Sequence, residues 1–277
     1  MRFFLLLLFV SELCFAYPDK PIRFLIPSGP GGGVDMVARI VSRKMTEEFD
    51  KSVIADNRGG AGGIVAFNIL LDSPKDGYTI ALHNNGIQEE FVKNHSLKEI
   101  QTVARQPVAL SVVSSLNVKS INEFISYAKT NPYKIHFGHG GIGSVIHIAS
   151  LEFEKMYGVS FTYLPYKGGY TSILPMFTNE TQMVIIGMSA MIPYRQSEKI
   201  KILAISGDNR SNLAPEIPTF KEQGYKYNFH IWYSVVTHDN LPKNVTDKLV
   251  NVIKNIDSES FTKLGINKWT VTRNKGE

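Results

Sequence analysis

Three glycine-rich loops recur along this chain, each between a segment predicted to be a strand and a segment predicted to be a helix. They cover residues 27–33, 56–63 and 138–144. Repeated strand–loop–helix units favour mostly parallel sheets with helices on both faces. Because ligands bind at the carboxyl ends of the strands in such sheets, the loops would all lie at the binding end. We therefore expect an α/β fold in which two sheets face each other and the loops line one cleft.

The first loop has the chemistry of an anion site. A strand is predicted from Ile22 to Ile26, and a helix from Val34, with Val37, Val41 and Met45 on one face. Unpaired N–H groups converge at a helix N-terminus, where the helix dipole places roughly half a positive charge. This arrangement indicates a protein that captures a small anion.

The remaining elements continue the alternation. Apolar runs predict strands at 53–55, 78–82, 108–113, 135–137, 161–164, 183–186, 200–205 and 229–236. Helices are predicted at 64–71, 120–129, 145–156, 170–177 and 243–253. Ser120 is a predicted N-cap with Glu123 at the capping-box position, and Gly158 is a predicted C-cap. The long run at 229–236 would return the chain to the first domain.

Residues 1–16 have the pattern of a secretion signal. An early positive charge precedes a short apolar run from Phe3 to Val10, and Ala16 is the small residue at its end. The run is much shorter than the ~20 residues needed to span a bilayer. Cleavage after Ala16 would remove Cys14, the only cysteine, and leave no disulfide and no cysteine metal site. Lipidation of Cys14 is an alternative that the bulky Leu13 disfavours. We expect a periplasmic protein.

The charge pattern does not favour nucleic-acid binding. The net charge is +5 and the pI about 9.1, but the basic residues are scattered rather than gathered with aromatic residues in one patch. A mild positive excess would help an anionic ligand to approach.

Residues 138–143, Gly-His-Gly-Gly-Ile-Gly, match the dinucleotide-binding fingerprint and follow a predicted strand. That fingerprint also needs an acidic residue at the end of the following strand, which here ends Leu164-Pro-Tyr-Lys167. Because this acidic residue is missing, we expect no nucleotide and no other cofactor. The same loop can still hold an anion without the acid.

Other candidate chemistry remains open. Ser144 and His147 lie one turn apart and could form a nucleophile–base pair, although no acidic partner for His147 can be assigned. Ser144 could instead be an N-cap, and His147 either a ligand donor or a half-buried histidine. Lys167 could supply charge, its loop could bind through backbone amides, or the segment could be an exposed turn. The seven histidines show no zinc-binding spacing, so no metal site is expected.

Several segments, in this order, resemble the substrate-binding proteins of tripartite tricarboxylate transporters, the Bug family. The matching segments are Tyr17-Pro-Asp-Lys-Pro-Ile-Arg, Pro27-Ser-Gly-Pro-Gly-Gly-Gly-Val-Asp, Asp56-Asn-Arg-Gly-Gly-Ala-Gly-Gly, Asp76-Gly-Tyr-Thr, Tyr163-Leu-Pro-Tyr-Lys-Gly and Pro215-Glu-Ile-Pro-Thr-Phe. The resemblance covers nearly the whole mature chain. It implies a monomeric, two-lobed periplasmic binding protein without enzymatic activity, which delivers a small carboxylate to large and small membrane permease subunits.

The resemblance also implies the lobes and the ligand contacts. Lobe 1 would comprise residues 17–115 and 232–277, and lobe 2 residues 116–231. The ligand would be held by backbone amides, hydroxyls and ordered waters from facing loops. The implied ligand-binding residues are Ser28, Gly31, Gly32, Gly60, Ala61, Gly62, Asn84, Asn85, Gly141, Ser144, His147, Tyr166, Lys167 and Gly168.

One departure from the family concerns ligand type. Many relatives have an acidic residue facing the cleft near the segment Ile185-Ile186-Gly187-Met188, where this chain has none. Two other function classes also remain. One is a sensory binding protein that presents its ligand to a receptor, and the other is an exported hydrolase that uses Ser144 and His147.

Overall fold

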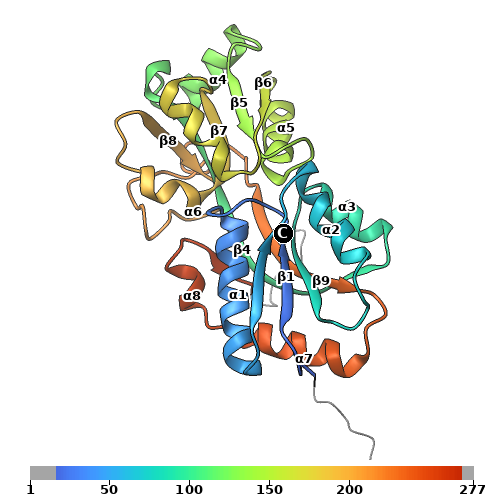
Figure 1. The fold of residues 1–277 in the computed structure, drawn as a ribbon. Helices are drawn as coiled ribbons and strands as arrows, with labels where there is room; N and C mark the ends of the chain where they lie inside the picture. The colour runs from blue at the N-terminus through green and yellow to red at the C-terminus, as the bar shows by residue number, and fades with distance from the viewer. Residues whose placement is uncertain (1–16, 270–277) are drawn as a thin grey trace, which may run out of the picture.

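The structure, a computed structural model, describes residues 17–269. The predicted leader and Cys14 lie outside the described residues. Two lobes are stacked one above the other and joined by strands that run between them (Figure 1). No helix within residues 17–269 combines the length and apolar character needed to cross a membrane.

Lobe 1 is built on one twisted sheet. Its strands are β2 (Val53–Asn57), β1 (Ile22–Ile26), β3 (Thr79–Asn84), β9 (His230–His238), part of β4 (Leu97–Val113) and β10 (Asn267–Lys268). The pairings of β1 with β2 and β3 are parallel, as expected. Its helices are α1 (Gly33–Phe49), α2 (Ile64–Leu71), α3 (Ile87–Asn94), α7 (Lys243–Lys254) and α8 (Glu259–Thr262).

Lobe 2 has its own sheet, formed by the end of β4 with β7 (Met183–Gly187), β8 (Ile200–Ile205), β5 (His136–His139) and β6 (Thr162–Pro165). Its helices are α4 (Ile121–Thr130), α5 (Val145–Tyr157) and α6 (Met188–Met191). Short 3₁₀ segments cover residues 61–63, 114–116, 170–172, 174–178 and 192–194.

Strand β4 belongs to both sheets. Residues 97–107 pair with β9, and residues 108–113 pair with β7 and β8. The strand was predicted only over 108–113, because its first half alternates poorly: the register shifts between Glu99 and Gln101 and again between Thr102 and Ala104. Such bulges break the two-residue period on which a strand prediction depends. Strands β4 and β9 also make both sheets partly antiparallel. The predicted lobe limits stay a prediction.

Local signals explain most helix positions. The predicted apolar face of α1 is buried, since Val37, Val41 and Met45 are all 0% exposed. Ser120 Oγ accepts a hydrogen bond of 3.2 Å from the Glu123 N–H, which confirms the N-cap of α4. Gly158 ends α5 in the left-handed conformation. The helix predicted at 170–177 is instead two 3₁₀ segments, because Pro175 has no N–H to continue an α-helical ladder.

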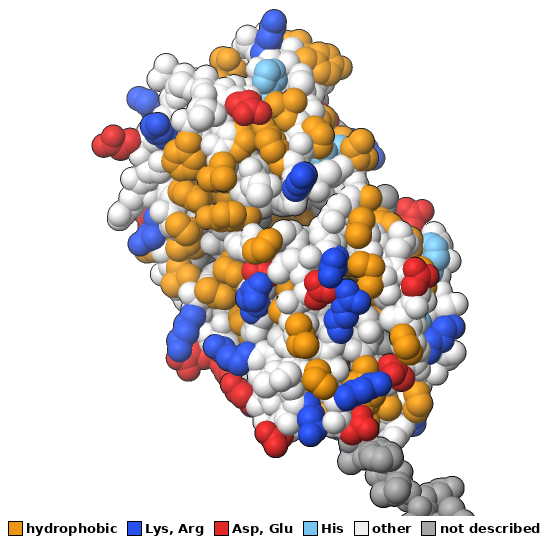
Figure 2. Space-filling view, viewed as in Figure 1, with side chains coloured by type: hydrophobic (Ala, Val, Ile, Leu, Met, Phe, Trp, Pro, Cys, Tyr) orange, Lys and Arg blue, Asp and Glu red, His pale blue; other side chains and the backbone are white. Residues whose placement is uncertain are grey.

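Buried apolar side chains form one core that extends through both lobes, with a smaller cluster beneath α2 and α3. On the face shown in Figure 2, hydrophobic side chains gather on lobe 2, while charged side chains are more frequent on lobe 1. The strand ends that carry the three glycine loops point toward the junction between the lobes (Figure 1).

Candidate functional site: a neutral pocket between the lobes

A pocket lies where the two lobes meet, and loops from both lobes form its wall. Lobe 1 contributes the loop before α1, together with Gly62, Asn84, Gln88, Gln106, Ile231 and Tyr233. Lobe 2 contributes the loop before α5, the turn after β6, and the end of β7. The glycine loops therefore converge on one cleft.

Six of the predicted ligand-binding residues line this pocket: Ser28, Gly32, Gly62, Asn84, Ser144 and Gly168. The other eight lie within two positions of a lining residue along the chain and do not form part of the pocket wall. They are Gly31, Gly60, Ala61, Asn85, Gly141, His147, Tyr166 and Lys167. The role of all fourteen residues in ligand binding stays a prediction.

Several of these eight residues have structural partners. Asn85 joins the end of β3 to β9, because its amide donates to the His230 carbonyl at 2.8 Å and accepts from the Trp232 N–H at 3.0 Å. The Tyr166 hydroxyl donates to Glu180 at 2.8 Å. Lys167 lies near the pocket through its backbone, with its carbonyl oxygen 3.5 Å from the position of a Cβ on Gly29.

Backbone atoms of the two lobes come into close contact around the pocket. A Cβ on Gly86, in the loop before α3, would lie only 2.9 Å from the backbone nitrogen of Val145. A Cβ on Gly168 would lie 3.4 Å from the backbone nitrogen of Gly29. Glycine at these positions lets the loops approach without side chains between them. The structure therefore shows the lobes closed over the pocket.

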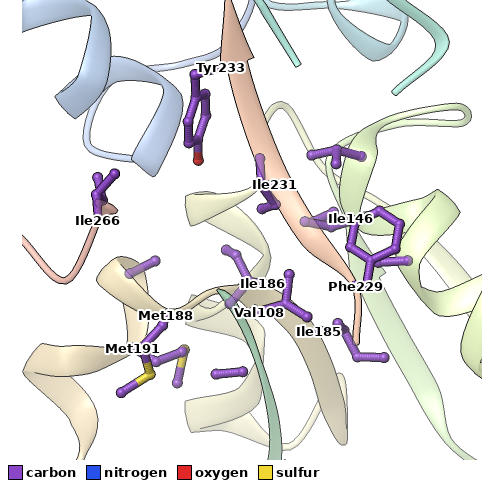
Figure 3. Close-up of a cluster of buried hydrophobic side chains, with 14 of the residues drawn as sticks. Val108, Ile146, Ile185, Ile186, Met188, Met191, Phe229, Ile231, Tyr233 and Ile266 are labelled. Atoms are coloured by element: carbon purple, nitrogen blue, oxygen red, sulfur yellow. The ribbon is translucent and has the colours of Figure 1, made fainter. Parts of the chain in front are cut away.

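Part of the pocket wall is apolar. Val145 and Ile146 come from α5, Ile186 from β7, Ala190 from α6 and Ile231 from β9, and each is at most 7% exposed. Figure 3 shows Ile146, Ile186 and Ile231 on neighbouring elements, with the Tyr233 ring beside them. A ligand in this space would lay a hydrocarbon segment against these side chains.

Polar groups also line the pocket, and none of the lining side chains carries a formal charge. Gln88 accepts from the Asn84 N–H at 3.1 Å and donates to the Gly62 carbonyl at 2.8 Å, which ties the second loop to the end of β3. Ser144 is the N-cap residue of α5, and its buried hydroxyl has no partner within the described part of the chain. The pocket therefore offers donors from amides and hydroxyls rather than from cations.

A buried carboxylate outside the pocket holds the first loop through hydrogen bonds. Asp35, which is 4% exposed, accepts hydrogen bonds from the Gly31 N–H at 3.0 Å, from Arg39 at 3.0 Å and from Asn57 at 2.9 Å. The same Asn57 amide donates to the Ser28 carbonyl at 3.0 Å. Although burial raises the pKa of the Asp35 carboxyl, these donors hold that pKa below its usual value. Asp35 does not line the pocket.

Two stacked histidines support the third loop. The rings of His139 and His147 lie 4.8 Å apart between centroids, with Tyr163 edge-on to both. His147 Nδ1 accepts from the Gly143 N–H at 3.2 Å. Burial lowers the pKa of both imidazoles, and the charge of His139 lowers that of His147 further. Between Ser144 and His147 the structure shows no hydrogen bond, so the pair that a hydrolase would need is not formed within the described residues.

Sequence reasoning missed Gln88, Gln106, Tyr170 and Tyr233, although all four line the pocket. Gln106 lies before the predicted strand at 108–113, so the sequence gave no sign that this side chain is 0% exposed in the structure. Tyr233 lies within an apolar run and gave no signal of its own. Residues 17–269 contain no group of three or more His, Cys, Asp or Glu side chains placed to hold a metal ion.

Comparison with known proteins identifies the family. The family model for the tripartite tricarboxylate transporter family receptor matches residues 37–271. This chain belongs to that family. The family comprises periplasmic solute-binding proteins, and the likeness to two-lobed binding proteins extends over most of the chain.

Among the relatives is the protein BugT of Bordetella pertussis, 26% identical over 88% of this chain and 77% of the relative. A protein encoded in the tcbD–tcbE intergenic region of Pseudomonas sp. strain P51 is 28% identical over 84% of this chain and 73% of its own length. Similar solved structures include Rpa4515 of R. palustris with adipate (25% identity, TM-score 0.84, 91% of this chain and 89% of that one). The periplasmic binding protein BugD is also similar (27% identity, TM-score 0.83, with the same coverage).

Proposed function

We propose that this chain captures a small carboxylate between its two lobes and delivers it to the membrane subunits of a tripartite tricarboxylate-type transporter. The observation that carries this proposal is the neutral pocket at the N-termini of two helices. Gly33 and Val34 open α1, Ser144 and Val145 open α5, and all four residues line the same pocket. Each helix N-terminus favours an anion by about 0.3–1 kcal/mol, and by up to ~2 kcal/mol where it is partly buried.

The pocket composition supports a carboxylate over other solutes. An ammonium group would need a carboxylate or several acceptors, and no acidic side chain lines the pocket. The apolar part of the wall, which includes Ile146, Ile186 and Ile231, suits a hydrocarbon segment of the ligand. The similar protein from R. palustris was solved with adipate, a carboxylate that has such a segment.

The binding cycle follows from the topology. Strand β4 and the start of β9 connect the lobes. A change in the backbone dihedral angles of these strands would therefore let the lobes open and close. In the closed form the loops before α1, α3 and α5 would surround the ligand, and the permease subunits would recognise that form. We propose that the protein acts as a monomer and is exported by cleavage after Ala16.

A thermal-shift screen tests the ligand class. Protein would be unfolded, dialysed and refolded to remove bound solute, then melted with mono-, di- and tricarboxylates, amino acids and neutral sugars. A ligand at ~100 times its dissociation constant stabilises the fold by about 2.7 kcal/mol. We expect shifts with carboxylates that lack an ammonium group. A cooperative melt that shifts only with sugars or amino acids would contradict the proposal.

The role in transport needs a separate test. With the ligand identified, the purified permease subunits would be titrated with ligand-loaded and ligand-free protein. We expect tighter association of the loaded form, since closure joins surfaces of both lobes. Equal binding of the two forms would argue against delivery by the closed state.

A further inference from the structure

Two buried polar side chains meet in the pocket wall, on the strands that connect the lobes. Gln106 on β4 is 0% exposed and Tyr233 on β9 is 1% exposed. The Gln106 amide nitrogen donates a hydrogen bond to the Tyr233 hydroxyl. Both residues line the pocket between the lobes.

The orientation of the Gln106 amide is fixed by the backbone. The Ser189 N–H donates to Gln106 Oε1 at 3.2 Å, so the amide oxygen faces α6 and the NH₂ group faces Tyr233. The Tyr233 hydroxyl therefore accepts from Gln106 and has its own hydrogen left to donate. No acceptor for that hydrogen is found within residues 17–269. Burial raises the pKa of Tyr233 far above its ordinary value, which keeps the hydroxyl protonated.

This hydroxyl lies beside the first residue of α1. A Cβ on Gly33 would be 2.8 Å from the Tyr233 oxygen and 3.3 Å from Ser189 Oγ. Ser189 is 7% exposed, and its hydroxyl has no partner within the described residues. The hydroxyls of Tyr233 and Ser189, each with a hydrogen left to donate, thus lie against the N-terminal end of α1. The first-turn N–H groups of that helix have no intrahelical acceptor. The carboxylate nearest along the chain, Asp35, is turned away to Gly31, Arg39 and Asn57.

We propose that Tyr233 is a specificity-determining ligand residue, whose hydroxyl, oriented by Gln106, donates to a ligand carboxylate oxygen at the first turn of α1 and excludes an ammonium group from that end. The inference rests on the proposed carboxylate function and adds how one end of the ligand is selected. An ammonium group there would lie against the positive end of the α1 dipole and would find hydroxyl oxygens but no carboxylate among the lining residues, whereas a carboxylate accepts from the hydroxyls and the helix N–H groups.

The test uses ligand pairs that differ at one end. Succinate, glutarate and adipate would each be titrated by calorimetry beside the ω-amino acid with the same number of methylene groups, for example glutarate beside 4-aminobutyrate. We expect Tyr233→Phe to weaken dicarboxylate binding by about 10- to 100-fold, the effect of one hydrogen bond to a charged group. The matched control is Tyr227→Phe, which removes another buried tyrosine hydroxyl, bonded to the Ala149 carbonyl at 2.8 Å and outside the pocket.

A charge reversal separates specificity from structure. Gln106→Glu keeps the shape but adds an acceptor that would take the Tyr233 hydrogen and repel a carboxylate. We expect dicarboxylate binding to fall by at least about 100-fold, and the preference for glutarate over 4-aminobutyrate to shrink or reverse. A purely structural role would weaken both ligands equally, and that result would overturn the inference.

The outcomes for the two proposals differ. If Tyr233→Phe and Gln106→Glu both bind dicarboxylates as tightly as the wild-type protein, and melt at temperatures like that of Tyr227→Phe, only the role of Tyr233 is overturned. Failure of the wild-type protein to bind any carboxylate in the wider screen contradicts the proposed function, and this inference with it.

Discussion

Asp35 Oδ2 accepts a hydrogen bond of 3.0 Å from the backbone N–H of Gly31, four residues earlier in the chain. The carboxylate is buried and also binds Arg39 and Asn57. One side chain at the start of α1 thus fixes the loop from Ser28 to Gly32, part of which forms the pocket wall. The glycines give this loop its conformational range, and Asp35 selects one conformation.

Replacement of Asp35 tests this relationship. In Asp35→Asn, an NH₂ group would face at least one of the three donors, so a buried hydrogen bond is lost and a donor is left unpaired. We expect the free energy of unfolding to fall by about 1–3 kcal/mol, with weaker ligand binding, as measured by denaturant titration and calorimetry. The control is Asp247→Asn, which removes an exposed ion pair with Lys243 on α7 and should have little effect. Unchanged affinity in Asp35→Asn would show that the loop keeps its conformation without this carboxylate.

Gly86→Ala tests lobe closure. The new methyl group would lie 2.9 Å from the nitrogen of Val145, the first residue of α5 in the other lobe, and 3.0 Å from the carbonyl oxygen of Gly143 in the loop before α5. The backbone of Gly86 has a negative φ of −96°, so alanine adds no backbone strain. The methyl group would also lie 3.1 Å from Asn84 Oδ1 in its own lobe, a contact that is the same in the open and closed forms. We expect the contacts with Gly143 and Val145 to add about 1–3 kcal/mol of crowding to the closed form, and therefore roughly 5- to 150-fold weaker binding.

Small-angle scattering would show whether ligand still compacts the Gly86→Ala protein. The comparison variant is Gly59→Ala, whose methyl group would lie 3.3 Å from Gly29 within the same lobe and so crowds no contact between lobes. Normal affinity and compaction in Gly86→Ala would contradict the closure geometry.

The stacked pair of His139 and His147 predicts a loss of stability in acid. Burial lowers the pKa of both imidazoles in the folded chain. The unfolded chain binds these protons at about pH 6.5, whereas the folded chain does not until lower pH. The free energy of unfolding should therefore be highest above pH ~6.5 and fall as the pH is lowered toward the folded pKa values.

The variant His147→Gln isolates this contribution. Its amide oxygen can still accept from the Gly143 N–H, but the side chain does not titrate. We expect a smaller loss of unfolding free energy between pH 7.5 and pH 5.5 than in the wild-type protein, measured by denaturant titration at both values. The same pH dependence in both proteins would show that His147 does not control the effect.

Much of the fold could be predicted because local signals agreed with the tertiary context. The apolar face of α1, the Ser120 cap and the Gly158 cap each depend on residues within about one turn or on a regular period. The prediction was incomplete for β4, where two bulges interrupt the alternation. It was wrong for segment 170–177, where Pro175 replaces the α-helical ladder with 3₁₀ turns.

The residues that line the candidate site also fall into those that the sequence could predict and those that it could not. Loop residues such as Ser28, Gly62 and Ser144 could be predicted, since a glycine-rich loop before a helix has a physical use that its sequence displays. Gln106 and Tyr233 could not, because they are separated by 127 positions and meet only through the pairing of β4 with β9.

The sequence by itself determined the alternation of strands and helices, the three loops rich in backbone donors, and the absence of acidic residues from the segment at 185–188. Only the tertiary structure decided which side chains enter the pocket and which side of each loop faces it. The physical reason is that local sequence sets backbone preference and periodicity, whereas sheet register and the contact between lobes set which distant groups meet. At this site the sheet register within lobe 1 places the Tyr233 hydroxyl beside Gly33, and the contact between lobes brings Gly86 against Val145.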